Sequence, residues 1–159
     1  MKYFALVFVL LSLVSCSSND SVSEEVSESE IERYFGNFPE SPFLDLQFDE
    51  PIEQSQLKLS NQKFRQQEFQ EDDWRTEDEK VEVLFHDQEK LAQFKIFFFD
   101  KKEEFLDELE LKMTDSASKS EKMDSFSVYS FDTDRTKYTV TLFSFENLIR
   151  LQFNILKSH

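Results

Sequence analysis

The stretch KYTVTLFSFENLIRLQFNIL, residues 137–156, shows the clearest pattern in this chain. Apolar and polar residues alternate over 148–156, so that one set of side chains falls on one face of an extended strand. The apolar members of this set are Ile149, Leu151, Phe153 and Ile155. Residues 137–145 alternate in the same way, and Glu146–Asn147 suits a tight turn because Asn tolerates a positive φ. The stretch therefore predicts a β-hairpin with one face in the core.

Shorter alternating stretches predict further strands around this hairpin. Residues 80–85 and 91–99 alternate on either side of a polar turn, which predicts a second antiparallel hairpin. Residues 126–131 predict one more strand, directly before the hairpin of 137–156. Far upstream, residues 43–48 alternate as well and predict a strand that ends at the sequence DEPIE.

One long helix is predicted between the second hairpin and the strand at 126–131. Phe105, Leu109 and Met113 recur every four residues and form one apolar stripe along a helix. Asp100 and Glu103 have the spacing of a capping pair, so we expect the helix to begin at Asp100. A helix of this length covers only one face of a sheet.

Other segments show a weaker pattern. Residues 29–38 predict a short helix or turn, because Ser29 and Glu32 have capping-box spacing and Gly36 stands where a helix stop is expected. Residues 57–70 fit either an exposed strand or irregular structure. The polar stretches 71–79 and 115–125 predict loops: the first carries a lone Trp, and the second is rich in Ser and Lys.

This order of elements predicts an α+β domain. We expect an antiparallel sheet of about five to seven strands, with one long helix packed on one face. Of the 19 Phe residues of the chain, the 17 that follow residue 15 supply large apolar side chains for the core, whereas the chain contains only one Gly. At this length, one domain is the natural expectation, and we place it at residues 33–159.

A second apolar face is also predicted. Phe97 and Phe99 point away from the core face of their strand, and Phe143 and Phe145 do the same on theirs. We interpret this second face as core covered by the upstream strands, and a binding groove is the alternative. The candidate contact residues are Trp74 of the acidic loop, Phe97 and Phe99.

The N-terminus has the anatomy of a secretory signal. Lys2 supplies a positive charge, residues 4–13 form an apolar run, and the run is short for a membrane span. It ends in Leu13–Val14–Ser15–Cys16, which resembles the lipobox of bacterial lipoproteins. An ordinary secretory signal with an incidental Cys is the alternative.

The resemblance to lipoproteins implies a lipid anchor. Residues 1–15 would be removed as the signal peptide, and Cys16, the only Cys of the chain, would carry the diacylglycerol and a further acyl chain. Residues 16–32 would then form an acidic, Ser-rich tether. Ser17 after Cys16 fits the sorting pattern of outer-membrane lipoproteins, so we expect the protein in the cell envelope, at the outer membrane, facing the periplasm or the cell surface.

Composition argues against several functions. The chain has 33 acidic and 18 basic residues, and a net charge of −15 opposes binding to nucleic acid. Two His residues, one Gly and no free thiol after lipidation leave no nucleophile–base motif, zinc site or phosphate-binding loop. We therefore expect no enzyme activity, no cofactor and no metal. The acidic clusters 71–73 and 132–134 offer oxygen ligands for calcium, but neither has the full spacing or the Gly of a calcium-binding loop, so we expect solvated loops.

Three hypotheses follow for function. The first is a lipid-anchored, non-catalytic domain that binds another envelope protein or supports an envelope assembly. The second is an acidic inhibitor or immunity-type protein that blocks a basic enzyme or toxin by charge complementarity. The third and weakest is a carboxylate-based hydrolase, which would need a substrate cleft with a carboxyl group of raised pKa.

Overall fold

A computed structural model gives the fold of residues 29–86 and 89–158. The described chain forms one antiparallel sheet of eight strands in the order β1-β2-β3-β4-β8-β7-β6-β5, together with three helices. The predicted antiparallel α+β architecture is confirmed at this level. The expected sheet of five to seven strands was too small, and a single long helix is not confirmed.

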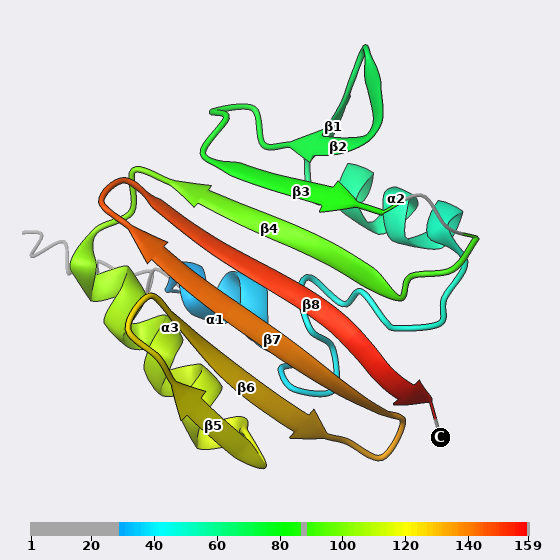
Figure 1. Cartoon of the computed structure of the whole chain (residues 1–159). Helices are drawn as coiled ribbons and strands as arrows, with labels where there is room; N and C mark the ends of the chain where they lie inside the picture. Colours follow the sequence, from blue (N-terminus) through cyan, green and yellow to red (C-terminus); the bar gives the residue numbers. More distant parts are fainter. Residues whose placement is uncertain (1–28, 87–88, 159) are drawn as a thin grey trace, which may run out of the picture.

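The sheet consists of two four-stranded meanders that meet at its centre (Figure 1). The first contains β1 (Arg65–Gln67), β2 (Gln70–Arg75), β3 (Val81–Phe85) and β4 (Gln93–Phe99). The second contains β5 (Lys119–Lys122), β6 (Phe126–Asp132), β7 (Thr136–Phe145) and β8 (Leu148–Ser158). Helix α3 (Glu103–Ser116) connects them, and β4 and β8 pair over seven residues, from Gln93↔Asn154 to Phe99↔Leu148.

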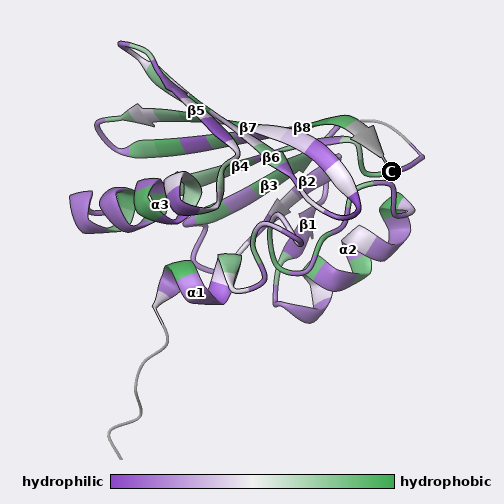
Figure 2. Ribbon diagram, turned by 90° about the horizontal axis from the view of Figure 1, so that it is seen from below, coloured by the Kyte–Doolittle hydropathy of each residue, from purple (hydrophilic) through white to green (hydrophobic). Residues whose placement is uncertain are grey.

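All three helices lie on the same side of the sheet (Figure 2). Helix α1 (Glu30–Phe35) packs on α3, and α2 (Ile52–Asn61) lies beside β1. The stripe predicted for α3 is confirmed, because Phe105, Leu109 and Met113 are buried. The predicted cap of this helix is wrong: its N-cap is Lys102, and Asp100 has a φ of 53° outside the helix.

The capping prediction for the first helix is confirmed. The backbone N–H of Glu32 donates to Oγ of Ser29 at 3.1 Å, which satisfies one of the free N–H groups of the first turn. The hydroxyl of Ser29 donates in turn to the Glu108 carboxylate at 2.9 Å. Lys112 lies 2.9 Å from the Glu32 carboxylate, so polar contacts join α1 to α3 in two places.

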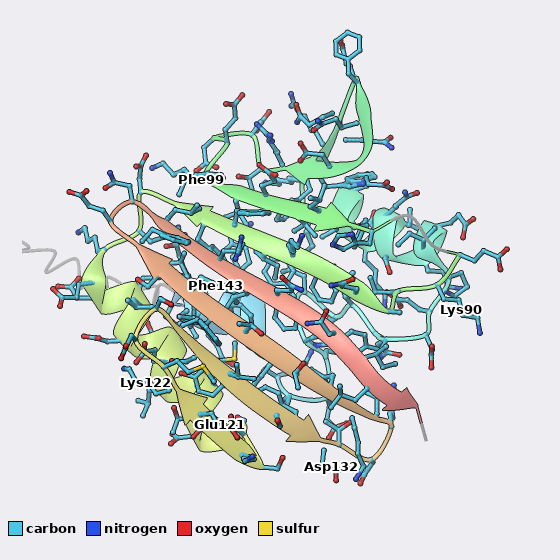
Figure 3. The ribbon with its side chains drawn as sticks, in the orientation of Figure 1. Lys90, Phe99, Glu121, Lys122, Asp132 and Phe143 are labelled. Atoms are coloured by element: carbon cyan, nitrogen blue, oxygen red, sulfur yellow. The ribbon has the colours of Figure 1, made fainter. Side chains whose placement is uncertain are left out.

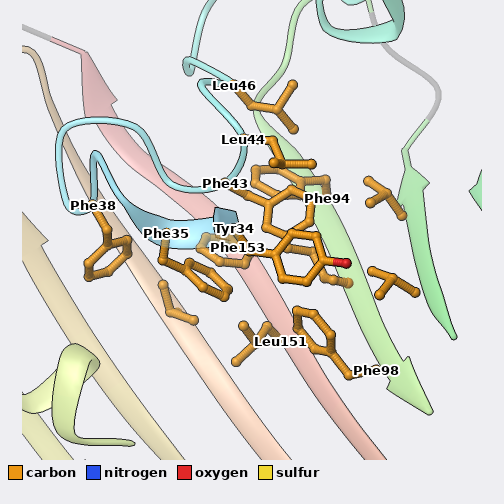
Figure 4. Packing of buried hydrophobic residues seen from close by; sticks show 14 of the residues in the cluster. Tyr34, Phe35, Phe38, Phe43, Leu44, Leu46, Phe94, Phe98, Leu151 and Phe153 are labelled. Atoms are coloured by element: carbon orange, nitrogen blue, oxygen red, sulfur yellow. The ribbon is translucent and has the colours of Figure 1, made fainter. Parts of the chain in front are cut away.

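An aromatic core fills the space between the sheet and the elements that cover it (Figure 4). Phe94 and Phe153 stack across the β4–β8 pair with ring centroids 4.6 Å apart. Phe98 of β4 contacts rings from α1, from the loop after it and from α3. A Phe-rich core of this kind supplies large buried apolar area to a chain with one Gly.

Three predictions of local structure were wrong. Residues 43–48 form turns instead of a strand, because Leu44 and Asp45 have left-handed φ values of 44° and 61°. The predicted loop at 71–79 contains most of β2, and the predicted loop at 115–125 contains β5. The ambiguous segment 57–70 begins as the end of α2 and continues into β1.

Candidate functional site: the open face of the sheet

The two faces of the sheet differ in what covers them. Apart from Ser144 and Ile155 near the strand ends, the side chains on the helix side of β3, β4, β7 and β8 are buried. On the opposite face, the side chains of β4, β6, β7 and β8 are half-buried to exposed, and none of the described helices lies on it (Figures 1 and 2). The interpretation of this second face as covered core is therefore wrong, because the upstream strands extend the sheet sideways instead of packing on it.

The side chains of this open face form rows across paired strands. We define the open-face patch as the outward-facing residues of the central strands. Its members are Gln93, Lys95, Phe97 and Phe99 of β4; Leu148, Arg150, Gln152 and Asn154 of β8; Thr139, Thr141, Phe143 and Phe145 of β7; and Phe126, Val128 and Ser130 of β6. Figure 3 shows Phe143 in the middle of this face.

One end of the patch is apolar. Phe99, Leu148 and Phe145 stand opposite one another on β4, β8 and β7, and Phe145 is 54% exposed. The rings of Phe97 and Phe99 stack 6.5 Å apart, and those of Phe126 and Phe143 lie 5.5 Å apart. Contiguous apolar surface of this kind on a folded domain is typical of an interaction site.

The opposite end of the patch is polar and internally hydrogen-bonded. The Gln93 amide donates to Oδ1 of Asn154 at 2.6 Å across the β4–β8 pair, and Gln152 donates to the same oxygen at 3.4 Å. Thr139 and Thr141 of β7 stand beside these residues. The patch therefore changes along the strands from aromatic rings to amides and hydroxyls.

Two cations lie between these ends. Arg150 stands between Phe97 and Phe143 in one row, and its guanidinium Cζ is 3.9 Å from the centroid of the Phe143 ring. Nε of Arg150 is buried without a hydrogen-bond partner in the described structure. Lys95 stands in the next row, beside Gln152. Among the described residues, no carboxylate lies within ion-pair distance of either cation.

The central strands also lack acidic residues on this face. Of the outward-facing positions of β4, β7 and β8 that the structure describes, none is Asp or Glu. On β6 the one acid is Asp132, at the end of the strand, and it is paired with Lys137. This is a marked local exception in a chain of 33 acidic residues.

Carboxylates occur instead at the margins of the face. Arg75 of β2 lies 3.0 Å from both the Asp73 and the Glu82 carboxylates. Burial raises the pKa of Glu82, and the negative charge of Asp73 raises it further. The hydrogen bond to Asp73 raises the pKa of Arg75. Glu121 and Asp132 lie toward the β5–β6 edge (Figure 3). The cation on β2 is thus neutralised, whereas Arg150 is not.

The candidate residues from the sequence fall in different places. Phe97 and Phe99 lie on the open face, as their alternation predicted, and both are half-buried. Trp74 does not lie in an exposed loop: it stands opposite Val83 on the covered face and is 8% exposed, so little of it is available to a partner. Cys16 and the lipobox residues Leu13, Val14 and Ser15 lie outside the described residues.

The remaining features relevant to chemistry are metal-ligating side chains and His86. No group of three or more His, Cys, Asp and Glu side chains that could hold a metal ion occurs among the described residues. His86 is half-buried at the end of β3, and its Nε2 has no hydrogen-bond partner there. Within residues 29–86 and 89–158, no helix has the length and apolar character needed to cross a membrane.

Sequence reasoning missed Arg150 and Lys95 as site residues. Both occupy polar positions of alternating strands, which are read as ordinary solvent-facing residues. Their significance depends on the β4–β8 pairing, which places Lys95 opposite Gln152 and Phe97 opposite Arg150, each more than fifty positions away in the chain. The one signal within the sequence was the absence of acidic residues from the outward positions of 137–156.

Comparison with known proteins adds no assignment to this geometry. No family model, curated protein or solved structure matches the chain.

Proposed function

We propose that this chain is a lipid-anchored protein of the cell envelope whose non-catalytic α+β domain binds another protein. In this proposal Cys16 carries the lipid at the outer membrane, and residues 17–32 tether the domain. The observation that supports binding is the open-face patch, because a domain with an aromatic core on one face leaves Phe145 54% exposed on the other. The signal anatomy and the lipobox resemblance support the anchor.

The anchor is tested with a Cys16→Ala variant. Two acyl chains hold a protein stably on a bilayer, since each buried methylene contributes about 0.8 kcal/mol. We expect wild-type protein to incorporate an alkyne analogue of palmitate and to sediment with outer-membrane fractions. The variant should incorporate none and remain uncleaved by the lipoprotein peptidase. Equal labelling of both proteins would contradict the assignment of Cys16.

Partner binding is tested by site-specific photo-crosslinking in intact cells. Benzoylphenylalanine is placed at exposed positions on both sides of the domain, such as Phe145 on the open face and Leu111 on α3, which is 61% exposed. A defined protein crosslinked from either side supports a binding function. Failure at every exposed position, with the protein folded and anchored, would contradict it.

A second candidate is the acidic inhibitor of a basic enzyme or toxin. The outer surface of α3 favours it, since four exposed carboxylates follow one another there: Glu103, Glu104, Asp107 and Glu108. Such a complex would weaken steeply with salt, because its attraction is between exposed charges. Crosslinks confined to α3, together with salt-sensitive binding, would favour the inhibitor.

A further inference from the structure

The open-face patch combines two cations with flanking aromatic rings, and this combination specifies a ligand. We propose that it is the docking site for an acidic, partly apolar segment of a partner protein, whose carboxylates pair with Arg150 and Lys95. The apolar side chains of that segment pack on the ring end of the patch. This inference rests on the proposed binding function and names the surface and the chemistry of the partner.

Arg150 is the centre of the site. Its guanidinium lies over the Phe143 ring at 3.9 Å, and Phe97 stands on its other side in the cross-strand row. The Phe143 ring covers one face of the guanidinium, so a planar acceptor would approach along its N–H edge. Nε is already buried without a partner, and a carboxylate accepts from Arg in a bidentate geometry.

Lys95 gives the site a second positive charge. Lys95 stands opposite Gln152 and Arg150 stands opposite Phe97, so the two cations are diagonal neighbours on β4 and β8. Diagonal cross-strand neighbours lie about 7–8 Å apart. That separation matches carboxylates two residues apart in an extended segment, or one turn apart in a helix. The partner should therefore carry at least two acids at such spacing.

The size of the patch favours one short segment of a partner protein as the ligand over a large protein–protein interface. Strands lie about 4.8 Å apart and same-face residues about 6.8 Å apart, so four strands and four rows span roughly 15 Å by 20 Å. A helix of about 10–12 Å diameter, or one or two strands, covers this area. A standard interface buries about 800 Å² on each partner, which is considerably more.

Charge argues against two other occupants of the patch, an anionic membrane and a second copy of this chain. Carboxylates stand around the patch: Glu82 of β3 beside Phe97, and Glu121 and Asp132 toward the β5–β6 edge (Figure 3). Because the whole chain also carries −15, a flat anionic membrane would be repelled at these margins. A segment as narrow as the patch meets fewer of these carboxylates than a flat surface does. In a symmetric dimer through this face, the cations Arg150 and Lys95 would meet their own copies, which is unfavourable.

The test uses the full lipidated chain in detergent micelles and fluorescent short peptides as probes. One peptide alternates Glu and Leu, a second Gln and Leu, and a third Lys and Leu. We expect the Glu/Leu peptide to bind at low salt, and Arg150→Gln or Lys95→Gln to weaken it by at least about tenfold. The Gln/Leu peptide should bind wild-type protein more weakly than the Glu/Leu peptide by a similar factor.

Matched controls remove the same charges elsewhere. Arg135→Gln and Lys90→Gln act at exposed cations outside the patch and should change the affinity by less than about twofold. Arg150→Glu should reverse the preference and bind the Lys/Leu peptide, which a variant that fails to fold does not do. Equal binding of the Glu/Leu peptide to wild type and Arg150→Gln, or no binding at all, would overturn the proposal.

Crosslinking separates this proposal from the binding function on which it rests. Benzoylphenylalanine at Phe143 should capture an acidic segment of a partner protein in intact cells, and Arg150→Gln should abolish the capture. Capture from Leu111 of α3 alone would keep the binding function and overturn the open face as its site. Capture of a second copy, or Arg150-dependent binding to anionic phospholipid vesicles, would overturn the acidic protein segment as the occupant.

Discussion

The two faces of the sheet are made by alternate residues of the same strands, yet only one of them is core. On β4, Phe94, Ile96 and Phe98 are completely buried, while their neighbours Phe97 and Phe99 are half-buried on the other side. The difference arises because α1, α2, α3 and the loop at 36–50 all pack on one face. A Phe at an alternating position is thus part of the core on one face and part of the solvent-accessible surface on the other.

The largest expected effect compares two adjacent Phe residues. Phe98 is fully buried and contacts the rings of Tyr34, Phe43 and Phe105. Phe98→Ala should lower the free energy of unfolding by about 3–5 kcal/mol, because it removes buried area and leaves a cavity. Phe97→Ala should cost less than about 1.5 kcal/mol, since the ring is already partly hydrated. Urea unfolding monitored by circular dichroism measures both.

Similar losses for the two variants would mean that the open face is covered in the folded protein. That outcome would contradict the distinction between the faces and remove the basis of the open-face patch.

The sequence predicted the elements in which local pattern and burial agree. Strands β6, β7 and β8 alternate because one face is core and the other is not, and α3 has its apolar stripe for the same reason. β5 was missed because the edge strand KSEK is exposed at all four positions and has no apolar pattern. The strand predicted at residues 43–48 was wrong because the apolar side chains of this segment are buried through turns of the covering loop.

The candidate site was predictable only in part, for a related reason. The outward position of Phe97 and Phe99 follows from alternation within one strand. Whether another element covers these two rings depends on where residues 30–61 pack, and no pattern within a single strand predicts that packing. The position of Arg150 between Phe97 and Phe143 requires the pairing of three strands.

A second comparison concerns two Arg residues in one row of the open face. Arg75 pairs with Asp73, whose side chain is 1% exposed, and also with Glu82; Arg150 has no such partner among the described residues. Arg75→Gln should cost about 2 kcal/mol, because it leaves a buried carboxylate without its counter-charge. Arg150→Gln should cost less than about 1 kcal/mol, the usual contribution of a cation–π contact.

Urea unfolding of the two variants at one pH measures this difference. A larger loss for Arg150→Gln than for Arg75→Gln would show that Arg150 is held by the fold. Arg150 would then have a structural role, and the patch would lose its binding centre.

A smaller effect tests how the covering loop is held to the sheet. The hydroxyl of Tyr138 on β7 donates to the backbone oxygen of Pro39 at 2.7 Å, and burial raises the pKa of this Tyr. Tyr138→Phe should lower the free energy of unfolding by about 1 kcal/mol, because the carbonyl loses its donor. Tyr129→Phe is the control, since the described structure gives the hydroxyl of Tyr129 no hydrogen bond.

Equal effects of the two Tyr variants would contradict this link between loop and sheet. Hydrogen exchange at Leu44 adds a local measurement, because its N–H donates to the Tyr34 carbonyl at 3.0 Å within the same covering segment. Faster exchange there in Tyr138→Phe than in Tyr129→Phe is the expected result.

The smallest expected effect lies in the turn between β2 and β3, at the edge of both faces. The hydroxyl of Thr76 donates to the Asp78 carboxylate at 2.6 Å and holds the pKa of that carboxyl below its ordinary value; the Lys80 N–H at 3.2 Å acts in the same direction. A lowered folded-state pKa stabilises the fold above the ordinary Asp range, and this contribution is lost as the pH falls through the folded-state value. Thr76→Val should move the pKa of Asp78 upward, as measured by the carboxyl carbon shift in an NMR titration. An unchanged pKa would assign the shift to Lys80, and a Thr76→Ser variant, which keeps the hydroxyl, should titrate like wild type.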